Sequence, residues 1–113
     1  MKSKRTKACE FSKKARQQVY GRDFGCIFCE AGYHVEEAEP YDLQIDGIMH
    51  YIPRSQGGLG IPENGALGCR YHHRMLDNGS SGRREEMLQI FREYLKGFYP
   101  AWSEEDLRYR KGE

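Results

Sequence analysis

The sequence predicts a small α+β domain that a bound metal ion holds together. The chain has 113 residues, of which only 38% are hydrophobic, and a core of that size usually needs a metal or disulfides for stability. The segment 43–52 alternates like a strand, whereas segments on either side have helical patterns. Two pairs of potential metal ligands share the same spacing, Cys26 with Cys29 and Cys69 with His72. We therefore expect a hairpin and a short helix, stapled by one zinc and flanked by N- and C-terminal helices.

Charge is distributed unevenly along the chain, although its net value is only +1. Residues 1–22 hold eight Lys and Arg side chains against Glu10 alone, whereas residues 23–49 hold seven acidic side chains and no Lys or Arg. We expect residues 1–11 to form a basic flexible arm. Such an arm is typical of proteins that bind phosphate backbones, and a solvated surface helix with a frayed tail is the alternative.

The first predicted helix covers residues 12–22. Phe11, Ala15 and Val19 recur every four residues, and Ser12 is a residue type that caps a first turn. Short elements are expected in the middle of the chain: a tight turn at 26–29, a loop at 30–42, a strand at 43–52, a loop at 54–65 and a second strand at 66–69.

A helix of two turns is then expected from Arg70 to Gly79, where glycine suits the left-handed residue that ends a helix. A longer helix is expected at 83–96, with an apolar stripe that includes Met87 and Phe91. The predicted organisation is a single domain over 12–113, with its core at 26–79 and a C-terminal helical extension at 80–113.

Four side chains form the predicted zinc site: Cys26, Cys29, Cys69 and His72. Three thiolates and a neutral imidazole are ligands that Zn²⁺ prefers in a closed structural site. His34 is an alternative fourth ligand, and four reduced cysteines without metal are the alternative to the site as a whole. No apolar run approaches the ~18 residues of a membrane span. We expect a cytoplasmic protein without membrane contact, in which closely spaced cysteines bind metal rather than form disulfides.

The chain contains an ordered set of motifs: Cys26-x2-Cys29, His50-Tyr-Ile-Pro-Arg-Ser-x-Gly-Gly, Asn64 and Cys69-x2-His72-His73. With these motifs the chain resembles the HNH endonucleases of the ββα-metal (His-Me finger) fold. It is most similar to the small zinc-containing versions found in phages and prophages. The resemblance spans residues 12–79, and residues 80–113 resemble the same proteins less specifically.

The resemblance implies a role for three further side chains. His50 would be the general base that deprotonates water, because its ordinary pKa of about 6.5 lies near working pH. Asn64 would hold the hairpin through side-chain to backbone hydrogen bonds. His73 would bind a catalytic divalent metal, Mg²⁺ or another such as Mn²⁺ or Ni²⁺, which would polarise the scissile phosphate.

Met49 departs from the family pattern, in which the residue before the base is typically an Asp or His that binds the metal. A thioether is a poor ligand for Mg²⁺ or Mn²⁺. Asp77 is a candidate replacement because it lies four residues after His73 on the same predicted helix face. Its alternative role is that of a turn residue, and Asp46 is a second, weaker candidate ligand.

Two function hypotheses follow from the sequence. The first is a metal-dependent endonuclease that hydrolyses DNA phosphodiester bonds with low sequence specificity, in phage DNA processing or packaging beside a terminase, within the bacterial host cell. The second is a catalytically silent zinc module that binds nucleic acid or a protein partner, such as a phage inhibitor of host defence. Met49 favours the second hypothesis, whereas His50, Asn64 and His73 together favour the first.

Overall fold

The fold is a small α+β domain built around one two-stranded antiparallel hairpin. The computed structural model describes residues 2–79 and 82–111. Its helices and strands follow the chain in the order α1 (Lys4–Cys9), α2 (Lys13–Arg22), α3 (Ile27–Glu30), β1 (Ile45–His50), β2 (Gly65–Cys69), α4 (Arg70–Asn78) and α5 (Arg83–Phe98). Short 3₁₀ helices lie at Val35–Glu37, Pro40–Leu43, Arg54–Gln56, Pro62–Asn64 and Glu104–Leu107.

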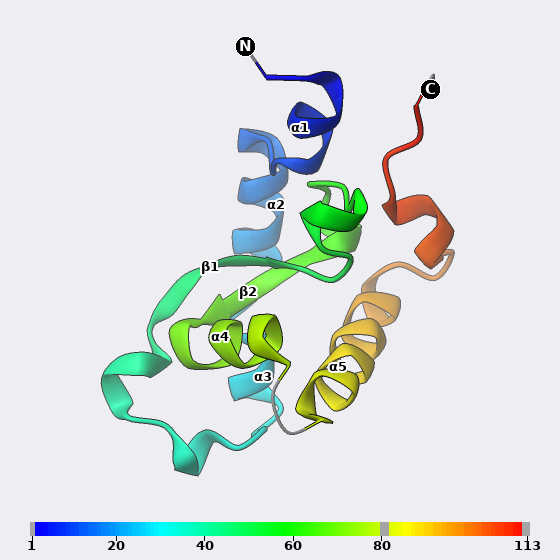
Figure 1. The fold of residues 1–113 in the computed structure, drawn as a ribbon. Helices are drawn as coiled ribbons and strands as arrows, with labels where there is room; N and C mark the ends of the chain where they lie inside the picture. The colour runs from blue at the N-terminus through cyan, green and yellow to red at the C-terminus, as the bar shows by residue number, and fades with distance from the viewer. Residues whose placement is uncertain (1, 80–81, 112–113) are drawn as a thin grey trace.

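The hairpin lies at the centre, and helices cover it from several sides (Figure 1). Helix α4 follows β2 directly and contacts both strands. Helix α5 contacts α3 and α4, and its stripe of Met87, Phe91 and Leu95 is fully buried in the core. This confirms the apolar stripe that the sequence predicts, since side chains four residues apart share one helix face.

The N-terminal segment differs from the predicted flexible arm. Residues 4–9 form helix α1, whose first turn is capped by the Ser3 hydroxyl, which accepts a hydrogen bond from the Thr6 amide at 3.1 Å. Cys9 is buried, and the Gly60 amide donates to the Ala8 carbonyl at 2.9 Å. The sequence does not reveal these long-range contacts, and they are what anchors a short, highly charged helix.

The other elements agree with the expected order and differ mainly at their ends. Helix α2 begins after its cap Ser12, as predicted, and α4 ends at Gly79 with a φ of 59°. The predicted loop over 30–42 contains two 3₁₀ helices, and β1 is shorter than the segment 43–52. Residues 80–81 and 112–113 of the predicted C-terminal extension lie outside the described residues.

A buried polar cluster joins α2, β2 and α5. The Asp23 carboxylate accepts hydrogen bonds from the Arg22 guanidinium at 2.7 Å, from the Leu67 amide at 2.8 Å and from the Tyr94 hydroxyl. Arg22 also donates to the Gly65 carbonyl at 2.6 Å. A buried carboxylate is stable only with partners of this kind, so the cluster fixes β2 relative to both helices. Across the parts of the chain that the structure describes, no helix is long and apolar enough to span a bilayer.

Candidate metal centre and adjoining cleft

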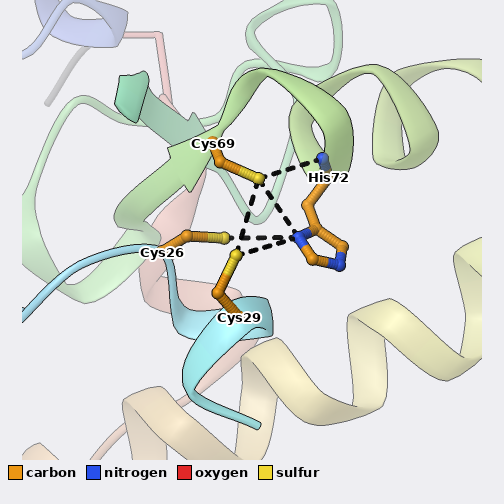
Figure 2. A group of neighbouring side chains, drawn as sticks. All are labelled: Cys26, Cys29, Cys69 and His72. Carbon is orange, nitrogen blue, oxygen red and sulfur yellow. Dashed lines mark hydrogen bonds between the residues drawn. The ribbon is translucent and has the colours of Figure 1, made fainter. Parts of the chain in front are cut away.

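The four predicted zinc ligands meet in one cluster between α3, the end of β2 and the first turn of α4 (Figure 2). His72 Nδ1 lies 3.6 Å from Cys26 Sγ, 3.5 Å from Cys29 Sγ and 3.2 Å from Cys69 Sγ. The Cys29 and Cys69 sulfurs are 3.7 Å apart, far beyond the ~2.05 Å of a disulfide. All four cysteines of the chain are free thiols.

Local structure explains why these side chains converge. Cys26 is the residue before α3 and Cys29 lies within that single turn, so both sulfurs point to one side. Cys69 ends β2 and caps α4, because its sulfur accepts a hydrogen bond from the His72 amide at 3.4 Å. The turn at residues 26–29 and the junction of β2 with α4 therefore face each other across the cluster.

The protonation of His72 suits metal binding. Its Nε2 lies 2.6 Å from the Tyr33 carbonyl, which can only accept, so Nε2 carries the proton and Nδ1 presents a lone pair to the sulfurs. The ring is fully buried and packs 5.5 Å from the centre of the Phe28 ring. A hydrogen-bonded second nitrogen is the usual arrangement of a metal-binding histidine.

The distances in the cluster are compatible with a structural zinc. A tetrahedral zinc with bonds of about 2.3 Å to sulfur and 2.05 Å to nitrogen sets its ligand atoms roughly 3.6–3.8 Å apart. Burial acts to raise the pKa of the Cys26 thiol, but the contact with the His72 ring and hydrogen bonds from the backbone outweigh it and lower that pKa to about 7. Burial raises the pKa of Cys29 and Cys69. The cluster therefore has the ligand types, the spacing and the enclosure of a structural zinc site.

His34, the alternative fourth ligand, lies outside this cluster. Its ring pairs with Glu37 and stacks edge-on against Tyr33, and with Glu36 and Glu37 it forms a separate, more exposed group. Between the two histidines that the sequence left open, the structure places His72 among the sulfurs.

A polar cleft of about 450 Å³ lies on the other side of α4 from the cluster. It is lined by side chains from the end of β1, the following loop, α4 and the start of α5: His50, Pro53, Arg54, Ser55, Gln56, His73, Asp77 and Arg84. Arg84 donates a hydrogen bond to the Leu76 carbonyl, which ties the start of α5 to α4. Two arginines, two histidines and one carboxylate therefore share one cleft.

His50 is held in this cleft by the N-terminal segment. Its Nε2 lies 2.8 Å from the Cys9 carbonyl, so Nε2 donates and Nδ1 carries the lone pair. The Phe11 ring packs against it at a centroid distance of 4.5 Å. Burial lowers the pKa of His50, and the positive charge of Arg54 lowers it further, against the opposing effect of the Cys9 hydrogen bond. The neutral imidazole is thus the favoured form.

Asn64 is fully buried and clamps both ends of the loop that follows His50. Its side-chain oxygen accepts from the Ile52 amide at 2.8 Å, and its side-chain nitrogen donates to the carbonyls of Ile52 at 3.2 Å and Leu59 at 2.8 Å. These are side-chain to backbone hydrogen bonds of the kind that the resemblance implies for Asn64. They keep the loop folded back on the strand that carries His50.

His73 and Asp77 lie together on the outer face of α4. His73 Nε2 is 3.5 Å from Asp77 Oδ2, and His73 Nδ1 is 3.0 Å from Asp46 Oδ2. The side chain of His73 is 27% exposed and that of Asp77 is 68% exposed, so both are reachable from solvent. His72 and His73 are neighbours in sequence, yet they face the enclosed cluster and the open cleft respectively.

Met49 faces the core rather than the cleft. Its side chain is 0% exposed, and a Cβ added to Gly68 on the paired strand would lie 2.4 Å from the Met49 sulfur. The Met49 side chain therefore occupies the space next to Gly68, which has no side chain of its own. This is a core position, so Met49 supplies no ligand to the cleft.

Sequence reasoning assigned no role to the Cys9 carbonyl or to Arg84. A backbone carbonyl cannot be recognised from residue type. Gly60 is a sequence signal for the close approach of this segment, because a Cβ there would lie 2.2 Å from the backbone of Glu10. Arg84 belongs to a helix that the sequence predicted only as a core element. No protein-family model, curated protein or solved structure matches the chain.

Proposed function

We propose that the protein is a metal-dependent endonuclease that hydrolyses phosphodiester bonds of DNA, with the ββα-metal arrangement of the HNH family. One observation carries the proposal: a tautomerically fixed histidine, His50, shares a cleft with the His73–Asp77 pair. The order of hairpin, clamping Asn64 and α4 also supports it. The cytoplasm of a phage-infected bacterium, with a terminase as partner, is the setting that the resemblance suggests.

In this proposal, His50 acts through Nδ1. Its Nε2 hydrogen is committed to the Cys9 carbonyl, so Nδ1 accepts the proton of the attacking water. Burial and the neighbouring positive charge of Arg54 lower the pKa of His50, which keeps the base neutral near pH 7. The Phe11 ring restricts the imidazole to one orientation.

The divalent cation that such an enzyme needs fits the donor set of His73 and Asp77. The imidazole of His73 and the carboxylate of Asp77 would hold it, and phosphate and water would supply the remaining ligands, as is common for Mg²⁺ and Mn²⁺. When bound, the cation supplies charge stabilisation to the phosphate and the leaving oxygen. Arg54 and Arg84 line the same cleft and are suited to bind neighbouring phosphates.

The affinity for DNA in this proposal comes from positive charge rather than from base contacts. Helix α1 carries Lys4 and Lys7, and Arg5 donates to the Ser55 carbonyl on the cleft loop at 3.3 Å. The basic N-terminal segment is therefore attached to the cleft itself. Binding through phosphates predicts low sequence specificity and a strong dependence on salt.

The experiment is cleavage of supercoiled plasmid at low salt by the zinc-loaded full chain, with Mg²⁺, Mn²⁺ and Ni²⁺ in turn. We expect nicking that needs a divalent metal and that falls by at least about 10²-fold in His50→Ala, because a general base contributes that much or more. His34→Ala is the matched control, since His34 lies outside the cleft. Asp77→Ala should also lower the activity, and Asp106→Ala, an exposed acid outside the cleft lining, should not.

A second candidate function is a zinc module that binds nucleic acid or a protein without cleaving. The burial of Met49 favours it, because the family's usual ligand position then holds a core residue. No cleavage with any of the three metals, from protein that carries zinc and binds DNA, would support this candidate against the nuclease. Cleavage that survives His50→Ala would instead contradict the assignment of the base.

A further inference from the structure

The backbone of β1 places Asp46 in an unusual position. In the hairpin, Ile45 pairs with Cys69 and Gly47 pairs with Gly68, so Asp46 is an extra residue without a partner. Gly47 has a φ of 146°, a conformation that side chains other than glycine rarely adopt. An unpaired residue of this kind is a β-bulge, and bulges redirect side chains away from the regular alternation of a strand.

The redirected carboxylate contacts His73. Asp46 Oδ2 lies 3.0 Å from His73 Nδ1, and since a carboxylate accepts, Nδ1 is the nitrogen that donates. In the neutral ring, Nε2 then carries the lone pair. That lone pair faces the Asp77 carboxylate at 3.5 Å. Two acceptors this close repel each other unless a positive charge lies between them, either a metal ion or a proton on Nε2.

The contact between Asp46 and His73 is exposed, so it orients the His73 ring more than it stabilises the fold. The Asp46 side chain is 43% exposed, and ion pairs between groups this accessible contribute little to the stability of the fold. Its main effect is therefore on the direction and the tautomer of the His73 ring. Metal-binding histidines commonly donate their second N–H to a carboxylate, which fixes the ring in this way.

We propose that Asp46 is a positioning residue that directs His73 Nε2 toward Asp77, so that the two present a divalent cation with a preformed pair of ligands. This inference rests on the proposed function for the purpose of the cation, but not for the arrangement of the side chains. It gives Asp46 a role different from that of a direct ligand. The bulge at Gly47 is the structural device that makes the contact.

The first test reads the tautomer of His73 by long-range ¹H–¹⁵N spectra of the zinc-loaded full chain at pH 7.5, without added metal. We expect Nδ1 to carry the proton and Nε2 to be free. In Asp46→Ala this preference should be lost, whereas Asp46→Asn should keep it, because the amide oxygen still accepts from Nδ1–H. Glu39→Ala, an exposed acid, matches the change in net charge and should leave His73 unchanged.

The second test titrates Mn²⁺ and follows the paramagnetic broadening of the His73 signals. This readout is specific for the site, which matters because His34, Glu36 and Glu37 form another group that could hold a cation. We expect Asp46→Ala to weaken binding at His73 by about 10–100-fold, and Asp46→Asn to weaken it less.

The outcomes separate this inference from the nuclease proposal. Unchanged tautomer and unchanged Mn²⁺ affinity in Asp46→Ala, or a protonated Nε2 in the wild-type chain, would overturn the role of Asp46 even if DNA is cleaved. The same holds if Mn²⁺ does not broaden His73 at all. Binding of Mn²⁺ that depends on Asp46, in a chain that cleaves nothing, would support the positioning role and contradict the nuclease.

Discussion

The two faces of α4 carry two sites of opposite design. On one face, His72 joins three cysteines in an enclosed cluster in which every ligand atom lies within 4.8 Å of the others. On the other face, His73 and Asp77 line an open cleft and have room for additional ligands. A closed ligand set suits a structural ion, whereas an incomplete one suits a cation that must also bind substrate.

In the proposed function, one short helix separates a structural site from a catalytic one. Successive residues on a helix point about 100° apart, so the neighbours His72 and His73 reach different environments. The enclosed side ties α4 to α3, and the open side ties it to β1 through Asp46. Five predictions test this separation; the first four run from the largest expected effect to the smallest, and the fifth concerns stability.

The largest effect should come from removing a ligand of the enclosed cluster. Cys26→Ser should abolish zinc binding and leave the chain largely unfolded, because structural zinc contributes about 10–16 kcal/mol in small zinc domains. Elemental analysis and circular dichroism measure both effects. Cys9→Ala is the matched control, since Cys9 is buried but lies outside the cluster. A folded Cys26→Ser chain with full zinc content would contradict the structural role.

A smaller but still large effect should follow from a charge at position 49. Met49→Asp should destabilise the domain by several kcal/mol, since an unpaired charge would be buried, whereas Met49→Leu should cost less than about 1.5 kcal/mol. Urea unfolding measures the difference. If Met49→Asp instead folded normally and strengthened Mn²⁺ binding at His73, residue 49 would belong to the open site and not to the core.

A moderate effect is expected from loosening the contact between the N-terminal segment and His50. In Gly60→Ala the new Cβ would lie 2.2 Å from the Glu10 carbonyl, so the backbone beside Cys9 must shift. We expect a destabilisation of about 1–3 kcal/mol and lower cleavage activity, with the zinc content unchanged. Gly97→Ala is the control, because a Cβ there meets no atom within 4 Å. Equal activity of the two variants would exclude a role for this segment in holding His50.

The smallest effect is on the pH dependence of cleavage. The pKa of His50 is lowered, chiefly by burial, so activity should begin to fall only below the ordinary value of about 6.5. Arg54→Ala should move this acid limb to higher pH, because it removes a positive charge that lowers the pKa. The pH profile of kcat/KM from 5 to 8 measures both. An unchanged limb in Arg54→Ala would contradict His50 as the titrating base.

The same shift has a consequence for stability. Because the folded-state pKa of His50 lies below its unfolded-state value, the unfolded chain binds the proton more readily. His50 therefore contributes stability that is fully present above about pH 6.5 and is lost as the pH falls through the folded-state pKa. Urea unfolding of His50→Ala should show a weaker loss of stability over this range.

Local patterns predicted most of the secondary structure. The caps Ser12 and Gly79, and the stripe of Met87 and Phe91, depend on residues within a few positions of each other, and all appear as expected. The zinc ligands were predictable for a similar reason, since the x2 spacing places two ligand atoms on one turn. Helix α1 was not predictable, because contacts with residues about fifty positions away hold it.

The sequence by itself determined which chemical groups the chain offers. These are a set of thiols and an imidazole with the spacing of metal ligands, a histidine whose side-chain type ordinarily titrates near neutral pH, and a carboxylate one helical turn from a second histidine. Only the tertiary structure decided which atoms face each other. It placed His72 rather than His34 among the sulfurs and buried Met49 in the core. It also brought the Cys9 carbonyl into hydrogen-bond distance of His50, and Asp46 into hydrogen-bond distance of His73. The physical reason is that tautomers, burial and bulges depend on partners distant in sequence, and short-range periodicity carries no information about them.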